Sequence, residues 1–318
     1  MNLIVDIALP IFGLGILGYF ASRIGFFPEQ AVDGLSRFVF DIAVPIMLVR
    51  VFANSRLPEN VPWDLLASFY IPIFSFYVIG IAVSRYIFKR TFMQSVITGL
   101  SCAFGNLVLL GLPLTLRSVG EEAAVPYFIV LSLHGISFYM LTTILLELGR
   151  HHRGSSTEIS SRILTALLTN PIIIAIVVGI VINISGVGLP SPLDQLAEYM
   201  QQAVAPCALF ALGASLTRYH IAGQIRESAF IIMMKNILFP MTVWFIAWEI
   251  LELEPLWIMV VVIMAAQPVG VTPFIFAERY NVSRPLAATT ILLSSVVSMF
   301  TITFILYLFT AMGLQLGG

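Results

Sequence analysis

Residues 265–281 read AAQPVGVTPFIFAERYN and lie inside an apolar run that starts near Leu256. This stretch carries Pro268, Gly270 and Pro273 within six positions. Proline removes an amide donor and clashes with the preceding helical turn, so a helix is expected to break here. Water cannot satisfy the freed carbonyls inside a bilayer, so such backbone is tolerated only where protein or a wet cavity surrounds it. Broken helices of this kind hold the substrate in secondary transporters, although proline kinks are also common in plain membrane spans.

A second stretch of the same kind lies in the first half of the chain. Residues 105–113 read GNLVLLGLP, again inside an apolar run. Asn106 precedes Gln267 by 161 residues, and Pro113 falls one position from Pro273 at the same shift. This shift also relates four pairs of identical residues: Pro10 and Pro171, Gly18 and Gly179, Gly25 and Gly186, and Pro45 and Pro206. The regularity indicates an internal duplication, with the two interrupted stretches at equivalent positions of the two copies.

The composition assigns the chain to the membrane proteins. Of its 318 residues, 59% are hydrophobic and only 10% are charged, whereas a soluble domain carries about 25% charged residues. The net charge of -1 does not indicate an acidic or basic partner. Cys102 and Cys207 lie in apolar runs and are too few for a disulfide framework, so we expect them to be reduced packing residues.

A membrane-spanning helix needs about 20 mostly apolar residues. Ten segments meet this requirement, and the fourth and ninth contain the interruptions: 3–22, 32–53, 65–88, 93–116, 122–147, 163–185, 194–217, 227–251, 256–278 and 286–312. Residues 1–148 then form a first repeat, residues 149–162 a hydrophilic linker and residues 163–318 a second repeat. Five spans per repeat is an odd number, so the copies must be inserted upside down relative to each other. The predicted fold is an all-α integral membrane protein with ten transmembrane helices in two inverted five-helix repeats.

Basic residues predict the orientation of these spans. Loops after the odd-numbered spans carry eleven Lys and Arg residues, and the loops on the other side carry three, which are Arg50, Arg56 and Arg117. Positively charged loops stay in the cytoplasm. We therefore expect a multi-pass protein of the cytoplasmic membrane with both termini outside and the 149–162 linker in the cytoplasm.

The same segments resemble the signatures of the auxin efflux carrier family, which includes plant auxin exporters and bacterial carriers of organic acids. Residues 268–281, PVGVTPFIFAERYN, are similar to its ninth-helix signature, and residues 106–113, NLVLLGLP, are similar to its fourth-helix signature. Asn170 and Pro171 at the start of span six, and ALFALGAS at residues 208–215 in span seven, match the pattern as well. The resemblance runs over essentially all ten spans.

The resemblance implies that helices four and nine cross at unwound centres and that the substrate binds beside this crossing. It also implies a scaffold domain and a transport domain, each built from both repeats, that move relative to one another as in an elevator. Gln267 stands where the plant carriers have an apolar residue. This departure favours a small, polar carboxylate of the malonate or malate kind over an aromatic, auxin-like substrate.

Asn106 is the first candidate binding residue. Its amide can donate to a carboxylate and accept from unwound amides, and the nearby half-helix N-termini carry partial positive charge that suits an anion. Equally, Asn106 can be a cap that only holds the interruption together. The remaining candidates flank the two interruptions, where they either contact the ligand or satisfy the backbone: Gly105, Pro113, Gln267, Pro268, Thr272 and Pro273.

Three ionisable residues within predicted spans are candidates for ion coupling or charge: Asp41, Lys235 and His134. A central charge costs roughly 2.5–3.5 kcal/mol on insertion scales, so it usually has a partner or a task. Asp41 is a candidate proton or cation site, or a partner of Arg37 four residues earlier. Lys235, next to Asn236, can attract an anion, neutralise Asp41 or extend to the surface. His134 can relay protons, although packing is the commoner role of a lone membrane histidine.

The sequence therefore predicts a secondary transporter that moves a small organic anion by alternating access. The alternative is a channel or a substrate sensor on a transporter scaffold, although rings of like charge along a pore are not evident. An enzyme is not expected, because Leu216 follows Ser215 where a serine protease motif needs glycine, and metalloprotease and phosphate-binding motifs are lacking. We expect no cofactor, while Na+ or H+ is a candidate coupling ion. The expected partners are an organic acid and the lipid bilayer, not nucleic acid, and a homodimer stays an open alternative.

Overall fold

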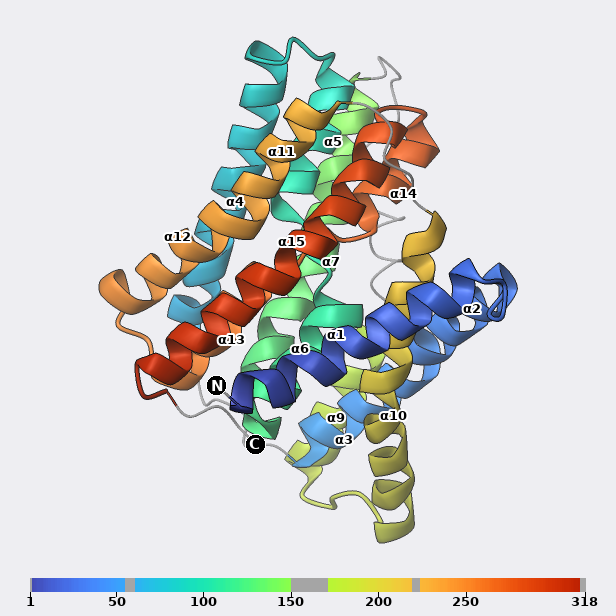
Figure 1. The fold of residues 1–318 in the computed structure, drawn as a ribbon. Coiled ribbons are helices and arrows are strands. Elements are labelled where there is room, and N and C mark those ends of the chain that lie inside the picture. Colours follow the sequence, from blue (N-terminus) through green and yellow to red (C-terminus); the bar gives the residue numbers. More distant parts are fainter. Residues whose placement is uncertain (1, 55–60, 150–170, 219–223, 315–318) are drawn as a thin grey trace.

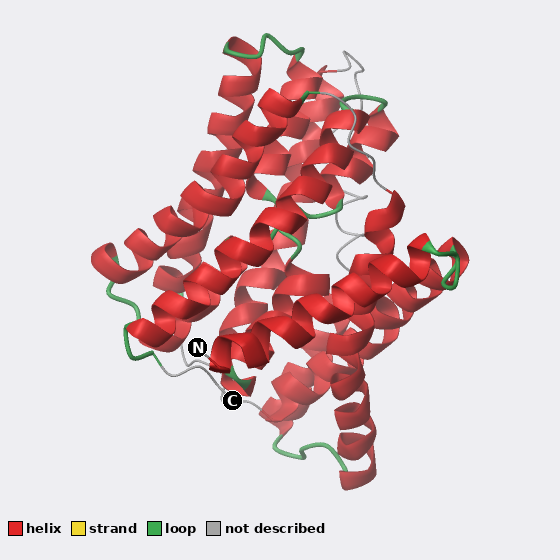
Figure 2. Cartoon of the chain, in the orientation of Figure 1, coloured by secondary structure: helices red, strands yellow, loops and turns green. Residues whose placement is uncertain are grey.

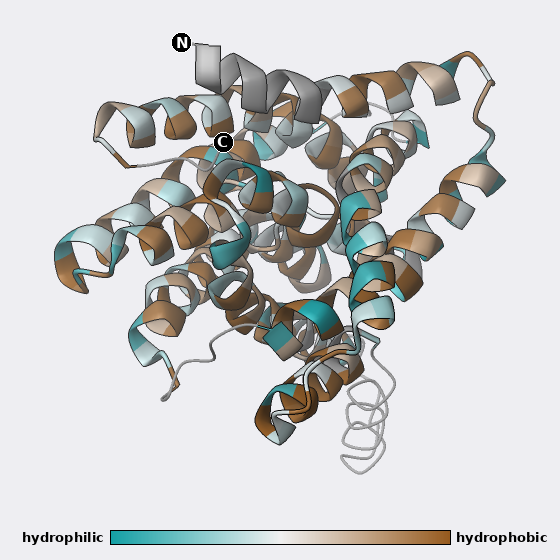
Figure 3. Cartoon of the chain, turned by 90° about the horizontal axis from the view of Figure 1, so that it is seen from below, coloured by the Kyte–Doolittle hydropathy of each residue, from teal (hydrophilic) through white to brown (hydrophobic). Residues whose placement is uncertain are grey.

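The computed structural model describes residues 2–54, 61–149, 171–218 and 224–314, and the regular structure in these ranges is helical (Figure 1). Four of the described helical segments are long and apolar enough to cross a membrane: Trp63–Tyr86, Glu121–Gly149, Ile225–Ile250 and Arg284–Ala311. Hydrophobic residues also run along helices on the outside of the bundle (Figure 3). An apolar exterior over long helices is typical of a multi-pass membrane protein.

The first half of the chain follows the predicted spans closely. Its elements are α1 (Asn2–Arg23), α2 (Glu29–Arg37), the π-helical η1 (Phe38–Ala43), α3 (Val44–Asn54), α4 (Trp63–Tyr86), α5 (Phe92–Ala103), the π-helical η2 (Leu107–Gly111), α6 (Leu112–Val119), the 3₁₀ turn η3 (Glu121–Ala123) and α7 (Ala124–Gly149). Predicted span two is thus one continuous helical segment that consists of α2, η1 and α3. Predicted span four consists of α5, an interruption, η2 and α6.

The second half contains a similar series of elements. Its elements are α9 (Pro171–Ser185), α10 (Ser191–Ser215), the 3₁₀ turn η4 (Leu216–Arg218), α11 (Ile225–Ile232), the π-helical η5 (Met233–Leu238), α12 (Phe239–Phe245), the π-helical η6 (Ile246–Ile250), α13 (Pro255–Ala265), α14 (Thr272–Tyr280) and α15 (Arg284–Ala311). Predicted span nine consists of α13, an interruption and α14. The predicted linker, apart from Gly149, and the first part of predicted span six lie outside the described residues.

The helices pack chiefly in two groups (Figure 1). In one group α1 packs along α10 and α3 packs along α9, with α2 beside α10. A Cβ atom on Gly213 would overlap the Gly15 carbonyl, so glycine lets α1 and α10 approach this closely. In the other group α4 packs along α5, α11 along α15 and α12 along α13. Here a Cβ atom on Gly80 would lie 2.8 Å from the Gly99 Cα atom, so α4 and α5 are also in close contact.

Both predicted interruptions are present. α5 ends at Ala103 after 12 residues, and α13 ends at Ala265 after 11 residues. At about 1.5 Å per residue each helix is roughly 18 Å long or less, which is shorter than the ~30 Å apolar core of a bilayer. Helical structure resumes at Leu107 and at Thr272. The intervening segments appear as short loops in the middle of the molecule (Figure 2).

The two interruptions lie against each other. The Asn106 amide donates to the Pro268 carbonyl over 2.8 Å, and the Gly270 amide donates to the Phe104 carbonyl over 2.9 Å. These bonds form an antiparallel bridge between segments that are far apart in the sequence. Gly270 fits here because a Cβ atom would lie only 2.8 Å from the Phe104 ring. Peptide groups that have no helical partner are thus paired within the protein interior.

Candidate functional site

A cavity of about 430 Å³ lies beside the paired interruptions. Part of its lining comes from the first interruption with η2, from the second interruption with the start of α14, and from α7. The rest comes from α2 and from the end of α10 with η4. The cavity is therefore bounded by both helix groups, and its polar lining includes Asp33, Ser36, Asn106, His134, Ser215, Arg218 and Thr272.

Asn106 lines this cavity and is 9% exposed. Its side-chain oxygen accepts a hydrogen bond from the Leu109 amide over 3.3 Å and so caps η2. Its Nδ2 group donates no hydrogen bond to any residue that the structure describes. Asn106 is therefore a cap, as one interpretation of the sequence held, and its two N–H groups remain available to a ligand.

The second interruption contributes mainly backbone to the cavity. Gly270 and Thr272 line it. Pro273 is buried as the second residue of α14, and Pro113 is buried in the first turn of α6. At Pro273 the missing amide is tolerated because the first turn of α14 has no intrahelical acceptors for its amides, whereas Pro113 follows directly on η2 within the helical segment Leu107–Val119. Pro268, Pro273 and Pro113 thus shape the interruptions without lining the cavity themselves.

Gln267 does not line the cavity, although it was a candidate for its wall. The side chain is fully buried, and its Nε2 group donates to the Ile263 carbonyl of α13 over 2.8 Å. Its Oε1 atom has no hydrogen-bond partner. Of the two roles that the sequence left open, satisfying the backbone is the one observed, because the side chain folds back onto its own helix.

Lys235 lies in π-helical η5 behind the first interruption and is fully buried. Its ammonium nitrogen donates to the Ala265 carbonyl over 2.7 Å and lies 4.9 Å from the centre of the Phe239 ring. A Cβ atom on Gly105 would lie 3.3 Å from the same nitrogen. Among the described side chains no carboxylate, including that of Asp41, lies within ion-pair distance of it. Extension to the surface and neutralisation of Asp41 are therefore both wrong, because the ammonium faces the protein interior.

His134 of α7 lines the cavity and is 2% exposed. Its ring lies 4.5 Å from that of Phe104, 5.3 Å from that of Phe138 and 6.0 Å from that of Phe69, measured between centroids. Neither ring nitrogen has a hydrogen-bond partner. The aromatic surroundings agree with the packing interpretation, while two unpartnered nitrogens beside a cavity are unusual enough in a folded protein to suggest that a ligand or water satisfies them.

Asp41 lies apart from this cavity. It belongs to π-helical η1, is exposed, and forms no ion pair with Arg37 or with any other described residue. The suggested pair with Arg37 is not formed, although Arg37 is the last residue of α2 and Asp41 follows it in η1. Within the described residues no cluster of three or more His, Cys, Asp or Glu side chains could hold a metal ion.

Arg218 lines the cavity but was not singled out in the sequence. From η4 its guanidinium donates to the Asp33 carboxylate over 2.7 Å and to the Glu29 carbonyl over 3.1 Å. The Arg218 and Asp33 side chains are 32% and 59% exposed, so the ion pair contributes little to stability and can exchange partners. In the sequence Arg218 counted only as a loop charge. Its place directly after the segment 208–215 was the one signal that could have identified it.

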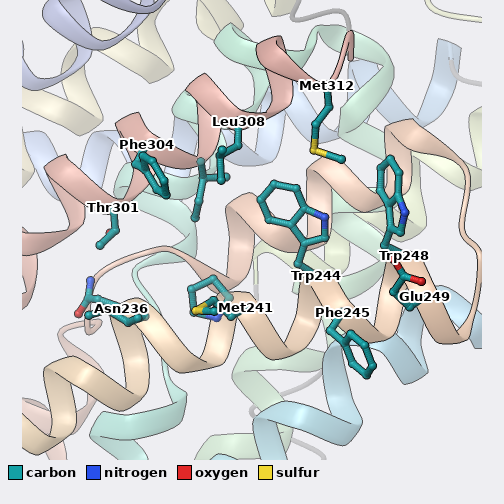
Figure 4. A pocket seen from close by; sticks show the side chains of 13 residues that line it. Asn236, Met241, Trp244, Phe245, Trp248, Glu249, Thr301, Phe304, Leu308 and Met312 are labelled. Atoms are coloured by element: carbon teal, nitrogen blue, oxygen red, sulfur yellow. The ribbon is translucent and has the colours of Figure 1, made fainter.

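A separate cavity of about 510 Å³ lies between the α12 region and α15 (Figure 4). Trp244, Trp248 and Phe304 line it, with Asn236 toward one end and Glu249 toward the other. No basic residue lies in its described lining, and most of the lining side chains are apolar. Such a surface suits hydrocarbon rather than a carboxylate, so the cavity beside the interruptions is the candidate binding site.

Comparison with known proteins finds similarity over almost the whole chain. The family described as "Membrane transport protein" matches residues 3–306. A "Putative malonate transporter" from Rhizobium meliloti (strain 1021) is 25% identical over 96% of this chain and 95% of its own length. "Auxin efflux carrier component 8" from Arabidopsis thaliana is 21% identical over 93% and 94% of the two chains. "Uncharacterized transporter YfdV" from Escherichia coli (strain K12) is 24% identical over 86% and 87%.

Proposed function

Because the chain belongs to the auxin efflux carrier family of membrane transport proteins, we propose that it is a secondary transporter that carries a small organic anion across the cytoplasmic membrane by alternating access. The observation that carries this proposal is the cavity between the paired interruptions and the other helix group. The chain is a transporter and not an enzyme.

Two inverted repeats are supported by a packing contact that occurs twice. A Cβ atom on Gly18 of α1 would overlap the Phe210 carbonyl of α10, and a Cβ atom on Gly179 of α9 would lie 2.9 Å from the Val49 carbonyl of α3. Gly179 follows Gly18 by 161 residues, and Phe210 follows Val49 by 161 residues. The two contacts therefore exchange under the shift that relates the repeats. A pseudo-two-fold axis in the membrane plane is a simple cause of this exchange.

In the proposed mechanism the two helix groups move relative to each other. The group that contains α4, α5, α7 and α11 to α15 carries the interruptions and acts as the transport domain, with the α5–α6 and α13–α14 passages as the crossed helices four and nine. The group that contains α1, α2, α3, α9 and α10 acts as the scaffold. Relative motion of the groups changes the side to which the cavity opens, which requires two states of similar energy.

The cavity offers several groups that suit a carboxylate. The N-terminal ends of helical segments Leu107–Val119 and α14 face it and carry partial positive charge. Asn106 adds neutral donors, and Arg218 adds a guanidinium that can bind a carboxylate through two parallel hydrogen bonds. We propose that one carboxylate binds at the interruptions and that Arg218 leaves Asp33 to bind a second. A dicarboxylate of the malonate class fits this arrangement.

The direction of transport follows from the charge of the substrate. With both termini outside and the 149–162 linker in the cytoplasm, as proposed from the loop charges, the membrane potential acts on the bound anion. An inside-negative potential favours exit by about 2.3 kcal/mol per charge at 100 mV. Export therefore needs no coupling ion, whereas uptake against the potential requires one.

The test is carboxylate counterflow in proteoliposomes that contain the purified protein. Malonate should show saturable uptake that is stimulated by malonate on the opposite side. Arg218→Gln should raise the half-saturation concentration for dicarboxylates by about tenfold, since a hydrogen bond to a charged group is lost, and should affect monocarboxylates much less. Arg226→Gln, which changes an exposed arginine remote from the cavity, is the control.

Each alternative outcome has a distinct meaning. Flux that neither saturates nor shows counterflow would indicate the channel alternative. Absence of carboxylate flux, together with absence of thermal stabilisation by any member of a carboxylic acid panel, would refute the proposed function.

A further inference from the structure

Lys235 occupies a position that broken-helix transporters give to their coupling cation. In such carriers unwound carbonyls and the C-terminal ends of half-helices coordinate the ion, because these ends carry partial negative charge. Ala265 is the last residue of α13, so its carbonyl lacks an amide partner in the helix. The Lys235 ammonium donates to this carbonyl over 2.7 Å. The cation at this helix end is therefore a side chain of the protein itself.

The Lys235 ammonium lies close to both interruptions. The ammonium lies close to Gly105 of the first interruption, where a Cβ atom would be 3.3 Å away. Asn236 follows Lys235 in η5, and its side-chain oxygen accepts over 2.7 Å from the Ser294 hydroxyl, which in turn accepts from the Val269 amide of the second interruption over 2.9 Å. Within the described part of the chain no carboxylate pairs with the ammonium. Its charge is therefore not balanced there by a described anionic side chain.

We infer that Lys235 is a tethered cation that replaces a coupling sodium ion, so that this carrier moves its anion independently of Na+. The inference rests on the proposed transport function and specifies its coupling. The ammonium stabilises the buried end of α13, as a bound ion does in a sodium-coupled carrier, and it supplies positive charge next to the interruption that Asn106 caps. Because this charge is covalently attached, it stays with the protein when the substrate leaves. Each carboxylate therefore carries its own negative charge across the membrane.

The first experiment compares carboxylate flux by the native protein in sodium buffer and in choline buffer of the same ionic strength. The rates should be equal in the two buffers. A requirement for Na+ would overturn the tethered cation while leaving the transport function intact. Absence of carboxylate flux in both buffers would instead contradict the proposed function, and the second experiment then decides on Lys235.

The second experiment does not depend on flux. Lys235→Ala opens a space at the end of α13, so Na+ or methylammonium should bind there and raise the Tm of the purified variant. The native protein should show no such stabilisation, and neither should Lys89→Ala, which removes the other, exposed lysine of the chain. Stabilisation of the native protein by Na+, or an unchanged Tm of Lys235→Ala with both cations, would overturn the inference.

A third variant covers the case in which Lys235→Ala does not fold. Lys235→Met keeps a side chain of similar length without the charge and fills the space. Its carboxylate flux should fall by about tenfold or more, because the Ala265 carbonyl loses a charged donor, and added Na+ should not restore it. Native flux by Lys235→Met would contradict a role for the ammonium.

Discussion

The two interruptions solve the same physical problem with different parts of the chain. Each leaves peptide groups without helical partners in the protein interior, where they need other hydrogen-bond partners. Besides the two backbone hydrogen bonds that the interruptions exchange, the first interruption is supported by one of its own side chains and by α7. The Asn106 side chain accepts from the Leu109 amide, and the Tyr127 hydroxyl donates to the Leu107 carbonyl.

In the second interruption the partners come from neighbouring helices. Ser294 of α15 accepts from the Val269 amide, and Lys235 of η5 donates to the Ala265 carbonyl. The side chain within the interruption that could have acted locally, Gln267, instead donates to the preceding turn of its own helix. Apart from the hydrogen bonds that the two interruptions exchange, the first is thus capped by its own Asn106, whereas the second depends on side chains from η5 and α15. We expect substitutions to separate these two cases.

The largest effect is expected from replacing the side-chain amides of Asn106 and Gln267, which lie 161 residues apart in the two interruptions. Asn106→Ala removes both the cap of η2 and the only side-chain amide of the interruptions that lines the cavity, so the affinity for substrate should fall by about tenfold or more. Gln267→Ala should leave the affinity close to that of the native protein. Half-saturation concentrations in counterflow measure both. Equal losses would mean that the two interruptions contribute equally to binding, and unchanged transport by Asn106→Ala would remove it from the site.

A smaller effect is expected on the stability of the second interruption. Ser294→Ala leaves the Val269 amide buried without an acceptor, so the free energy of unfolding should fall by about 1–3 kcal/mol. Ser295→Ala is the matched control, because the Ser295 hydroxyl donates only to the Ile291 carbonyl of its own helix. Chemical denaturation of the purified protein in detergent compares the two variants. If both lose the same stability, the contact between α15 and the interruption contributes nothing specific.

The smallest effect is expected from Tyr127→Phe. This variant removes one hydrogen bond to the Leu107 carbonyl, which still accepts from the Leu112 amide, so the loss should be about 0.5–1.5 kcal/mol. Tyr307→Phe, at a tyrosine that is 54% exposed on α15, should change the stability by less. A larger loss for Tyr127→Phe than for Ser294→Ala would reverse the comparison, since the first interruption would then be the more dependent one.

Much of the fold could be predicted from the chain because the relevant signals are local. The bilayer demands about 20 apolar residues per span, and this length is visible in any window of the sequence. The interruptions were predictable from Pro268, Pro273 and the Asn106 region for the same reason, since proline acts on its own turn. Asn106 was identifiable as a cap because its side-chain oxygen accepts from the Leu109 amide, only three residues later in the chain.

The candidate site was predictable only in part. Asn106, Gly105, Thr272 and His134 do line the cavity, whereas Asp41 does not. These differences arise from helix rotation and from π-helical turns, which shift the direction of each following side chain. Neither is encoded in the spacing of apolar residues.

The sequence by itself determined which segments are apolar enough to span a membrane and where two of them break, because these features depend on the chemistry of short segments. Only the tertiary structure decided that Lys235 reaches the end of α13, that Ser294 holds the second interruption and that Arg218 faces the cavity. Each of these contacts joins helices whose separation and rotation are set by packing across the whole molecule.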